Sequence, residues 1–160
     1  MKIAIKNLLV TVLGVTVMTS AAFATPTNEL VSATKTNKVT VLKETKNITK
    51  IVAAGNVEVF VMQAPIESIS VFDSYYSKNA LVQQKDGVLR ISSFEKEPLA
   101  VTVYVRNLSA IEATDNAVIK TYGKVNFLSL DLILSNNAKA EINANTVNLF
   151  TTVKDNASLK

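Results

Sequence analysis

Three related stretches decide the fold of this chain: TDNAVIK at residues 114–120, SNNAKAE at 135–141 and KDNASLK at 154–160. Their central asparagines, Asn116, Asn137 and Asn156, follow one another at spacings of 21 and 19 residues. The flanking residues agree as well. At offsets of −5, −3, +1 and +3 from each asparagine the chain repeats small or aliphatic residues, except at Thr151: Ile111, Leu132 and Thr151; Ala113, Leu134 and Val153; Ala117, Ala138 and Ala157; Ile119, Ala140 and Leu159.

All these offsets are odd, so the repeated residues lie on one face of a strand. A repeat of ~20 residues built from strands and asparagine-rich corners is typical of a β-solenoid, in which each coil stacks on the previous one. We expect Asn at each corner because it tolerates a left-handed backbone and bonds to nearby backbone groups. Four positions after each asparagine, Lys120, Glu141 and Lys160 would stack with alternating charge. An antiparallel meander, whose strands also recur evenly, is the alternative.

The N-terminal half of the chain also alternates with a period of two. Val57, Val59 and Val61 share one face, and further alternating runs surround Ile69 and Val101. Residues 80–84 and 88–91 flank Lys85-Asp86-Gly87, where Asp-Gly predicts a tight hairpin turn because Gly supplies a positive φ. No helical periodicity follows Ala24. The sequence therefore predicts an all-β fold with hairpin strands in its N-terminal part.

The segment from Met1 to Ala24 has the pattern of a cleaved export signal. Lys2 and Lys6 precede an apolar run over residues 8–18, and Ala22-Phe23-Ala24 is a small-x-small cleavage site. That run is shorter than the ~20 residues needed to span a bilayer. Residues 25–38 lack an apolar period and are expected to be a flexible leader. We expect the mature protein to be exported, to the periplasm, the outer surface or the medium, without stable membrane insertion.

Composition excludes several classes of function. The chain has no His and no Cys, which excludes histidine-dependent and thiol catalysis, His- or Cys-ligated metals and disulfides. Without the signal, the chain has 15 basic and 13 acidic residues, so its formal charge is +2. With no basic cluster, a nucleic-acid partner is not expected.

The chain resembles the putative auto-transporter adhesin, head GIN domain family of secreted Bacteroidetes proteins. Five segments before the corner repeats carry the resemblance from about residue 48: IV at 51–52, NVEVFV at 56–61, DGVLRI at 86–91, VTVYV at 101–105 and LSAIEA at 108–113. Family members usually have Gly-Ser-Gly or Gly-Ala-Gly at the corners, where this chain has Asp/Asn-Asn-Ala.

The resemblance implies a right-handed parallel β-helix-like structure and defines no catalytic residues. We expect one all-β domain of this type over residues 39–160, with repeat coils at about 108–160. The departure at the corners is conservative for the backbone, since Asn can replace Gly at positive φ.

The column formed by Asp115, Asn136 and Asp155 is the most evident candidate for a calcium or sugar site. At a coil spacing of about 4.8 Å, the two aspartates would lie roughly 9.6 Å apart. One calcium ion, with ligands at about 2.3–2.6 Å, cannot contact both. We therefore predict a turn-forming corner ladder, built around Asn116, Asn137 and Asn156, and no metal, cofactor or catalytic residues.

Tyr75 and Tyr76 form the densest aromatic cluster and could contact a partner or a glycan, although a core aromatic is the plainer interpretation. The favoured function is an exported, non-enzymatic binding or adhesion domain whose ligand is unknown. The alternatives are a structural envelope protein that self-associates through its C-terminal strand edge, and a polysaccharide-active β-helix enzyme. The enzyme would use paired carboxylates, but no motif or long loop supports one.

Overall fold

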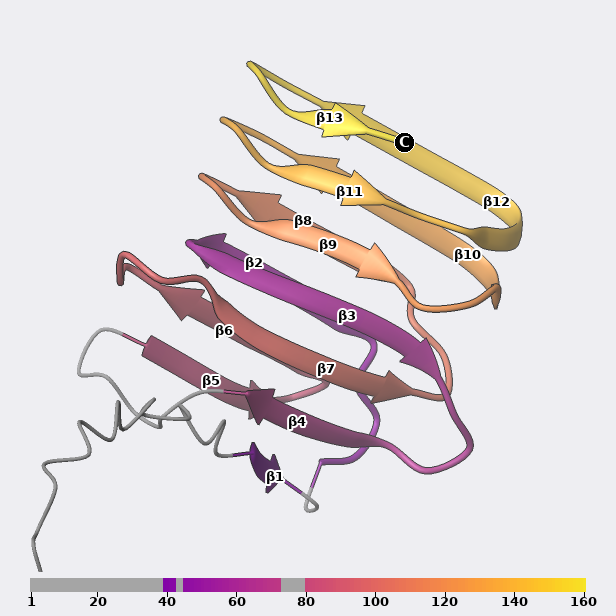
Figure 1. Cartoon of the computed structure of the whole chain (residues 1–160). Coiled ribbons are helices and arrows are strands. Elements are labelled where there is room, and N and C mark those ends of the chain that lie inside the picture. Colours follow the sequence, from indigo (N-terminus) through magenta and orange to yellow (C-terminus); the bar gives the residue numbers. More distant parts are fainter. Residues whose placement is uncertain (1–38, 43–44, 73–79) are drawn as a thin grey trace, which may run out of the picture. The chain divides into compact units, whose positions relative to one another are not determined.

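Every regular element in residues 39–42, 45–72 and 80–160, which the computed structural model describes, is a β-strand (Figure 1). These residues contain no helix that is long and apolar enough to cross a membrane. The expected all-β class is confirmed, whereas the export signal and the leader lie outside the described residues. The strands are β1 (Val39–Leu42), β2 (Lys50–Gly55), β3 (Val57–Gln63), β4 (Ser68–Phe72), β5 (Ala80–Lys85), β6 (Val88–Ser93), β7 (Leu99–Val105), β8 (Ala110–Thr114), β9 (Val118–Thr121), β10 (Val125–Leu134), β11 (Lys139–Glu141), β12 (Ala144–Val153) and β13 (Ser158–Leu159).

The strands form two mixed sheets. The first has seven strands in the order β1-β4-β7-β3-β9-β11-β13, and the second has six in the order β12-β10-β8-β2-β6-β5. Most neighbours are parallel, and antiparallel pairs occur only where β1, β4 and β5 join the sheets. The chain crosses from one sheet to the other at each corner, as from β2 to β3 and from β10 to β11 (Figure 1).

We use coil for two consecutive strands that cross from the six-stranded to the seven-stranded sheet, such as β8 with β9, β10 with β11 and β12 with β13. The register of these last three coils follows the sequence repeat. In the six-stranded sheet Leu132 lies opposite Ile111 on one side and Thr151 on the other, and Leu134 lies opposite Ala113 and Val153. In the seven-stranded sheet Ala140 lies between Ile119 and Leu159. The pairing is parallel throughout, so the antiparallel meander is wrong for this part of the chain.

The stacking order of the earlier coils departs from the chain order. The coil formed by β2 and β3 lies between the coil of β6 and β7 and the coil of β8 and β9 (Figure 1). Ala53 accordingly pairs with Ile91 on one side and Ala113 on the other. A coil from the start of the domain thus pairs with the first coil of the C-terminal repeat.

The core lies between the inward faces of the two sheets and consists of aliphatic residues. Val57, Val59 and Val61 are buried, as the period of two predicts, and so are Ile111 and Leu132. Adjacent coils place these side chains in columns, so each aliphatic residue packs on those above and below it.

The predicted hairpin is confirmed. β5 and β6 pair antiparallel, and Asp86 and Gly87 between them have φ of 50° and 80°. Two consecutive positive φ values match the right-handed twist of the strands, which explains the Asp-Gly sequence.

Candidate functional site

The corners of the coils place Asp and Asn side chains side by side on the surface. Each corner has a residue with positive φ: 61° at Asp115, 58° at Asn136 and 57° at Asp155. The left-handed residue is therefore the one before each central asparagine, and the expectation that the central asparagines adopt this conformation is wrong by one position. Short Asx side chains tolerate a positive φ because they can bond locally.

Hydrogen bonds link the left-handed residues of successive coils. Asn136 Nδ2 donates to Asp115 Oδ1 over 2.9 Å, and the Asn136 backbone N–H donates to Asp155 Oδ2 over 3.1 Å. Asn136 Nδ2 also donates to Thr114 Oγ1. Each carboxylate thus accepts a hydrogen bond from the middle coil, which orients both aspartates along the stack.

The central asparagines form a second column beside the first. Asn137 Nδ2 donates to Asn116 Oδ1, and Asn156 Nδ2 donates to Asn137 Oδ1, each over 3.5 Å. These bonds are long, and the three side chains are exposed, so the amides retain capacity to bond to an external group. The two columns line an open hollow of about 420 Å³: Asp115, Asn116, Asn136, Asn137, Asp155 and Asn156.

A fourth corner, which the repeat in the C-terminal third does not reveal, extends this surface. Ala54 lies opposite Thr114 and Glu58 opposite Val118, so Gly55 and Asn56 stand beside Asp115 and Asn116. Asn56 Nδ2 donates to the carbonyl oxygens of Glu95 and Lys96, which ties it to the loop after β6. The sequence signal is Gly55-Asn56-Val57, a glycine variant of Asp-Asn-Ala that lies far upstream of the repeat.

An exposed aromatic ring borders the fourth corner. Phe94 is 73% exposed and, with Gly55, Asn56, Glu95, Asp115 and Asn116, lines a second open hollow of about 430 Å³. The two hollows share Asp115 and Asn116. We name the whole surface, from Phe94 and Asn56 to Asn156, the corner surface.

The predicted aromatic contact residues, Tyr75 and Tyr76, lie outside the described residues. Phe94 is the aromatic side chain that the structure places beside the corner ladder, and its isolated position in the sequence gave no signal. Among the described residues, no group of three or more Asp or Glu side chains is positioned to hold a metal ion.

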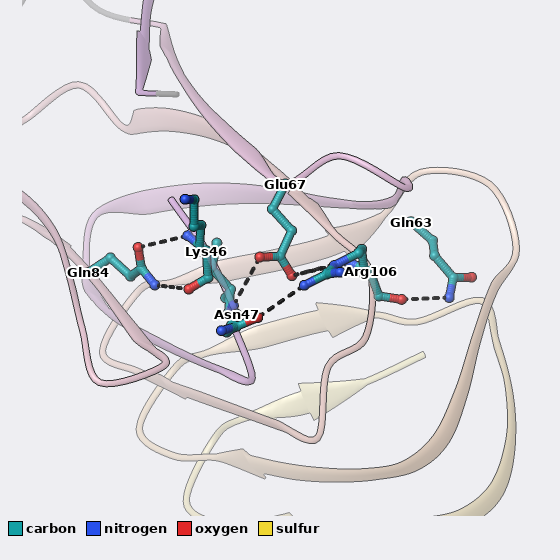
Figure 2. Close-up of polar contacts among 7 residues, drawn as sticks. Lys46, Asn47, Gln63, Glu67, Gln84 and Arg106 are labelled. Atoms are coloured by element: carbon teal, nitrogen blue, oxygen red, sulfur yellow. Dashed lines mark hydrogen bonds and ion pairs between the residues drawn. The ribbon is translucent and has the colours of Figure 1, made fainter. Parts of the chain in front are cut away.

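A polar cluster lies near the start of β2 and the end of β3, away from the corner surface, and joins segments that connect the coils (Figure 2). The Glu67 side chain is 5% exposed and accepts bonds from the backbone N–H groups of Ile48 and Arg106, both over 3.4 Å. The Arg106 guanidinium pairs with Glu67 over 3.8 Å and donates to Asn47 Oδ1 over 3.0 Å. Glu67 thus links the segment just before β2 to the segment just after β7.

Gln63 and Gln84 in the same view each bind backbone groups of another segment (Figure 2). Gln63 Nε2 donates to the carbonyl oxygens of Asn126 and Arg106, and Gln63 Oε1 accepts from the Asn126 N–H. Gln84 binds the backbone of Lys46 in the same two-sided way. These amides fix the segments that connect non-consecutive coils.

Charged pairs on the outer faces also join coils. Lys120 lies opposite Glu141 in the expected register, but its ion pair is with Glu58 on the other side, over 2.7 Å. Lys50 pairs with Glu112 across the six-stranded sheet. Both pairs link the β2–β3 coil to the β8–β9 coil.

Solved structures with a similar fold are only distantly similar in sequence. A putative lipid binding protein from Parabacteroides distasonis ATCC 8503 matches with a TM-score of 0.60 and 9% identity, over 78% of this chain and 60% of that one. A putative adhesin from Parabacteroides merdae ATCC 43184 matches with a TM-score of 0.60 and 15% identity, over 78% of this chain and 56% of that one. The chain thus spans less than two thirds of either structure, and the likeness establishes the fold alone.

Family membership rests on the sequence itself. No curated protein matches the chain. The family model described as putative auto-transporter adhesin, head GIN domain, matches residues 47–160, which include the corner surface and both sheets from β2 onward. The chain belongs to the putative auto-transporter adhesin, head GIN domain family.

Proposed function

We propose that this chain is an exported, non-enzymatic binding module of the adhesion type, and that its stacked coils form a right-handed β-helix-like solenoid. The parallel registers of β8, β10 and β12 and of β9, β11 and β13 support the solenoid. The family description and a structural neighbour named as a putative adhesin support the adhesion role. The corner surface supports the choice of ligand class.

The observation that carries the proposal is the double column of Asp and Asn side chains. Its amides and carboxylates repeat at the coil spacing of about 4.8 Å and are held in place by bonds between coils. A preorganised row of donors and acceptors loses little conformational entropy on binding. Such a row suits a ligand with many hydroxyl groups along its length, namely a polysaccharide chain.

Phe94 supports a carbohydrate ligand over a lipid. The apolar face of a sugar ring can pack on an exposed aromatic ring while its hydroxyls bond to neighbouring polar groups. Phe94 is exposed beside Asn56 and Asp115 in this arrangement. One structural neighbour is named as a putative lipid binding protein, but the main hollow here is lined only by Asp and Asn, which cannot cover an acyl chain.

A binding measurement on immobilised polysaccharides tests this proposal. We expect the mature protein to bind at least one polysaccharide on an array of bacterial and host glycans, and calorimetry to give its dissociation constant. Asn137→Ala should raise that constant about tenfold, because it removes the amide in the middle of the row.

The matched control is Asn145→Ala, which removes an amide of the same kind from another ladder. Asn145 Nδ2 donates to Asn126 Oδ1 over 3.3 Å, away from the corner surface. This variant should bind like the wild type. Equal losses in both variants, or binding only to lipid vesicles and to no glycan, would overturn the proposal.

Phe94→Ala provides a second, independent variant. It should weaken binding of the same glycan, whereas Tyr122→Ala, which truncates an equally exposed ring in the turn after β9, should not. If both substitutions leave the dissociation constant unchanged, the aromatic part of the proposed site is wrong.

Export is part of the proposal and rests on the signal pattern from Met1 to Ala24. The exported protein should begin at Thr25, and N-terminal sequencing of protein from the culture medium or the envelope measures this. A first residue within the apolar run would contradict cleavage after Ala24.

A further inference from the structure

The segment that leads into β2, residues 46–49, is fixed by hydrogen bonds to several other segments (Figure 2). Each of its residues bonds to a part of the chain that is distant in sequence: Lys46 to Gln84, Asn47 to Arg106, Ile48 to Glu67, and Thr49 to Gly87 and Ser109. The Ile48 side chain is also fully buried in the core. We name residues 46–49 the entry segment.

Thr49 bonds to the segments on both sides of it. Its N–H donates to the Gly87 carbonyl oxygen over 2.8 Å, and its own carbonyl oxygen accepts from the N–H groups of Ser109 and Ala110 over 2.9 and 3.2 Å. Gly87 directly precedes β6, and Ser109 directly precedes β8, and these strands are the two neighbours of β2. The entry segment thus extends the two ladders of β2, which contain six residue pairs with β6 and five with β8.

The entry segment and the corner surface lie at opposite ends of β2. The entry segment precedes Lys50, the first residue of the strand, whereas the corner at Asn56 follows its last residue, Gly55. The neighbouring strand β8 is parallel to β2 and ends just before the corner of Asp115 and Asn116. A force that acts between the entry segment and the corner surface is therefore directed along these strands.

Force along the strands has to break many hydrogen bonds together. The bonds of a parallel ladder cross from strand to strand, so sliding β2 past β8 strains all of them at once. Separating two strands from one end instead breaks their bonds one after another. Forced unfolding is governed by the unfolding rate, so a direction that strains many bonds at once should resist force better. β2 meets this resistance on both sides because it lies between β6 and β8.

We propose that the entry segment and the β2–β3 coil form a force-resistant link between the chain that precedes them and a ligand on the corner surface. The ligand of this link rests on the proposed function, whereas its mechanical strength does not. The carboxylate of Glu67 has a defined part in the link, because its two oxygens accept from the N–H groups of Ile48 and Arg106. Its side chain is 5% exposed, so water competes little for these bonds.

Single-molecule force spectroscopy of the mature protein compares two directions of force. Because the chain has no Cys, introduced cysteines attach the handles at chosen exposed sites. Lys46→Cys with Asn116→Cys, the along-strand pair, pulls the entry segment against a corner. Asn116→Cys with Asn137→Cys, the across-strand pair, pulls two neighbouring corners apart. At the same pulling speed, the rupture force should be several-fold higher for the along-strand pair.

Glu67→Gln tests the entry segment itself. The substitution keeps the shape of the side chain but replaces one acceptor oxygen with an amide NH₂ group, which cannot accept from Ile48 or Arg106. It should lower the rupture force of the along-strand pair and leave that of the across-strand pair unchanged. A general loss of stability would lower both forces, so the comparison separates a role in the link from a merely structural one.

Arg106→Gln is a second variant, which keeps the test possible if Glu67→Gln does not fold. It removes the guanidinium that bonds to Asn47 and pairs with Glu67, and it should also weaken the along-strand pair alone. Equal rupture forces in the two directions would overturn the proposal, and so would variants that weaken both directions equally. Neither measurement uses a glycan, so failure here is distinct from failure of the binding array.

Discussion

Lys120 donates a hydrogen bond to Glu58 over 2.7 Å, although 62 positions separate the two residues in the sequence. The contact exists because the coil of β2 and β3 is inserted between two coils that are made later in the chain. Lys120 Nζ also lies 5.9 Å from the centre of the Phe60 ring. The β3 strand is thus joined to β9, in the first coil of the C-terminal repeat, by the Glu58–Lys120 ion pair as well as by backbone hydrogen bonds.

The hydrogen bond and the charge of Glu58 raise the pKa of the Lys120 ammonium, and the charge of Glu141 adds to this while desolvation opposes it. A raised pKa in the folded state stabilises the fold below the ordinary lysine pKa, and this contribution is lost as pH rises through the folded pKa. Glu58→Gln should therefore lower the thermal midpoint at neutral pH. The difference from the wild type should close only in strongly alkaline solution.

Thermal unfolding followed by circular dichroism at a series of pH values measures this difference. The control compares the double variant Glu58→Gln with Lys120→Gln against the single variant Lys120→Gln. Because both lack the Lys120 ammonium, the difference between their thermal midpoints should not change as pH rises through the lysine pKa. A gap between wild type and Glu58→Gln that stays constant through the alkaline range would contradict the linkage.

Gly55, on the corner surface, should be harder to replace than Gly123, which lies in the turn after β9. Its φ is +78°, and a Cβ there would lie 2.2 Å from the Ser93 carbonyl oxygen, a backbone atom of the adjacent coil. Gly123 has nearly the same φ, +79°, but no atom within 4 Å of its Cβ position. Gly123→Ala should cost about 1–2 kcal/mol for the left-handed backbone alone.

Gly55→Ala should lower the free energy of unfolding by at least about 2 kcal/mol more than Gly123→Ala does. The reason is that the β2–β3 coil must move away from Ser93 in the adjacent coil to make room for the methyl group. Urea unfolding of both variants gives the two free energies. Similar values would mean that the corner can open without cost.

The stacking of the last three coils was predictable because each carries the same signal. The Asp/Asn-Asn-Ala corners show which positions of successive repeats are equivalent. The aliphatic residues at odd offsets from the central asparagine then predict which residues pair between neighbouring strands. Columns such as Ile111, Leu132 and Thr151 follow directly. A repeat in sequence predicts register wherever neighbouring coils are also neighbours in the chain.

The position of the β2–β3 coil was not predictable in the same way. Its pairing with β8 and β9 depends on contacts between segments that lie far apart in the sequence, and nothing local distinguishes this neighbour from the next coil in the chain. Gly55-Asn56-Val57 gives a weak signal that is recognisable only once the glycine is understood as a substitute for Asp115. Phe94 likewise joins the corner surface only through that long-range pairing.

The pattern of buried and exposed residues in β10 also differs from what the sequence alternation predicts. Phe127 and Leu130 are both buried although one has an odd and the other an even position, so the alternation of buried and exposed side chains shifts between them, and the apolar Leu128 faces solvent. Periodicity predicts a face only as long as the strand is regular, and such an irregularity has no clear residue signature.

Gln63 should stabilise the junction between β3 and the start of β10 through its amide group. Gln63→Glu keeps the shape but replaces the Nε2 donor with an anionic oxygen, which would face the carbonyl oxygens of Arg106 and Asn126. We expect a loss of about 1–3 kcal/mol in the free energy of unfolding. Gln83→Glu, the same change at an exposed position of β5, should have little effect, and equal losses would show that the amide bonds are not stabilising.

Leu132 is fully buried next to Ile111 in an inward-facing column, and Lys139 lies on the exposed face of the following strand. Leu132→Asp would place an unpaired carboxylate between Ile111 and the aliphatic interior, which costs at least several kcal/mol and is comparable to the whole stability of a domain of this size. Lys139→Asp introduces the same residue at a solvated site, where substitutions stay within about ±0.5 kcal/mol. Thermal and urea unfolding of the two variants should therefore give a molten or unfolded Leu132→Asp chain and a Lys139→Asp chain that unfolds like the wild type. Equal thermal midpoints of the two variants would mean that burial of Leu132 does not stabilise the repeat. The assignment of inward and outward side chains in the strands after β8 would then be wrong.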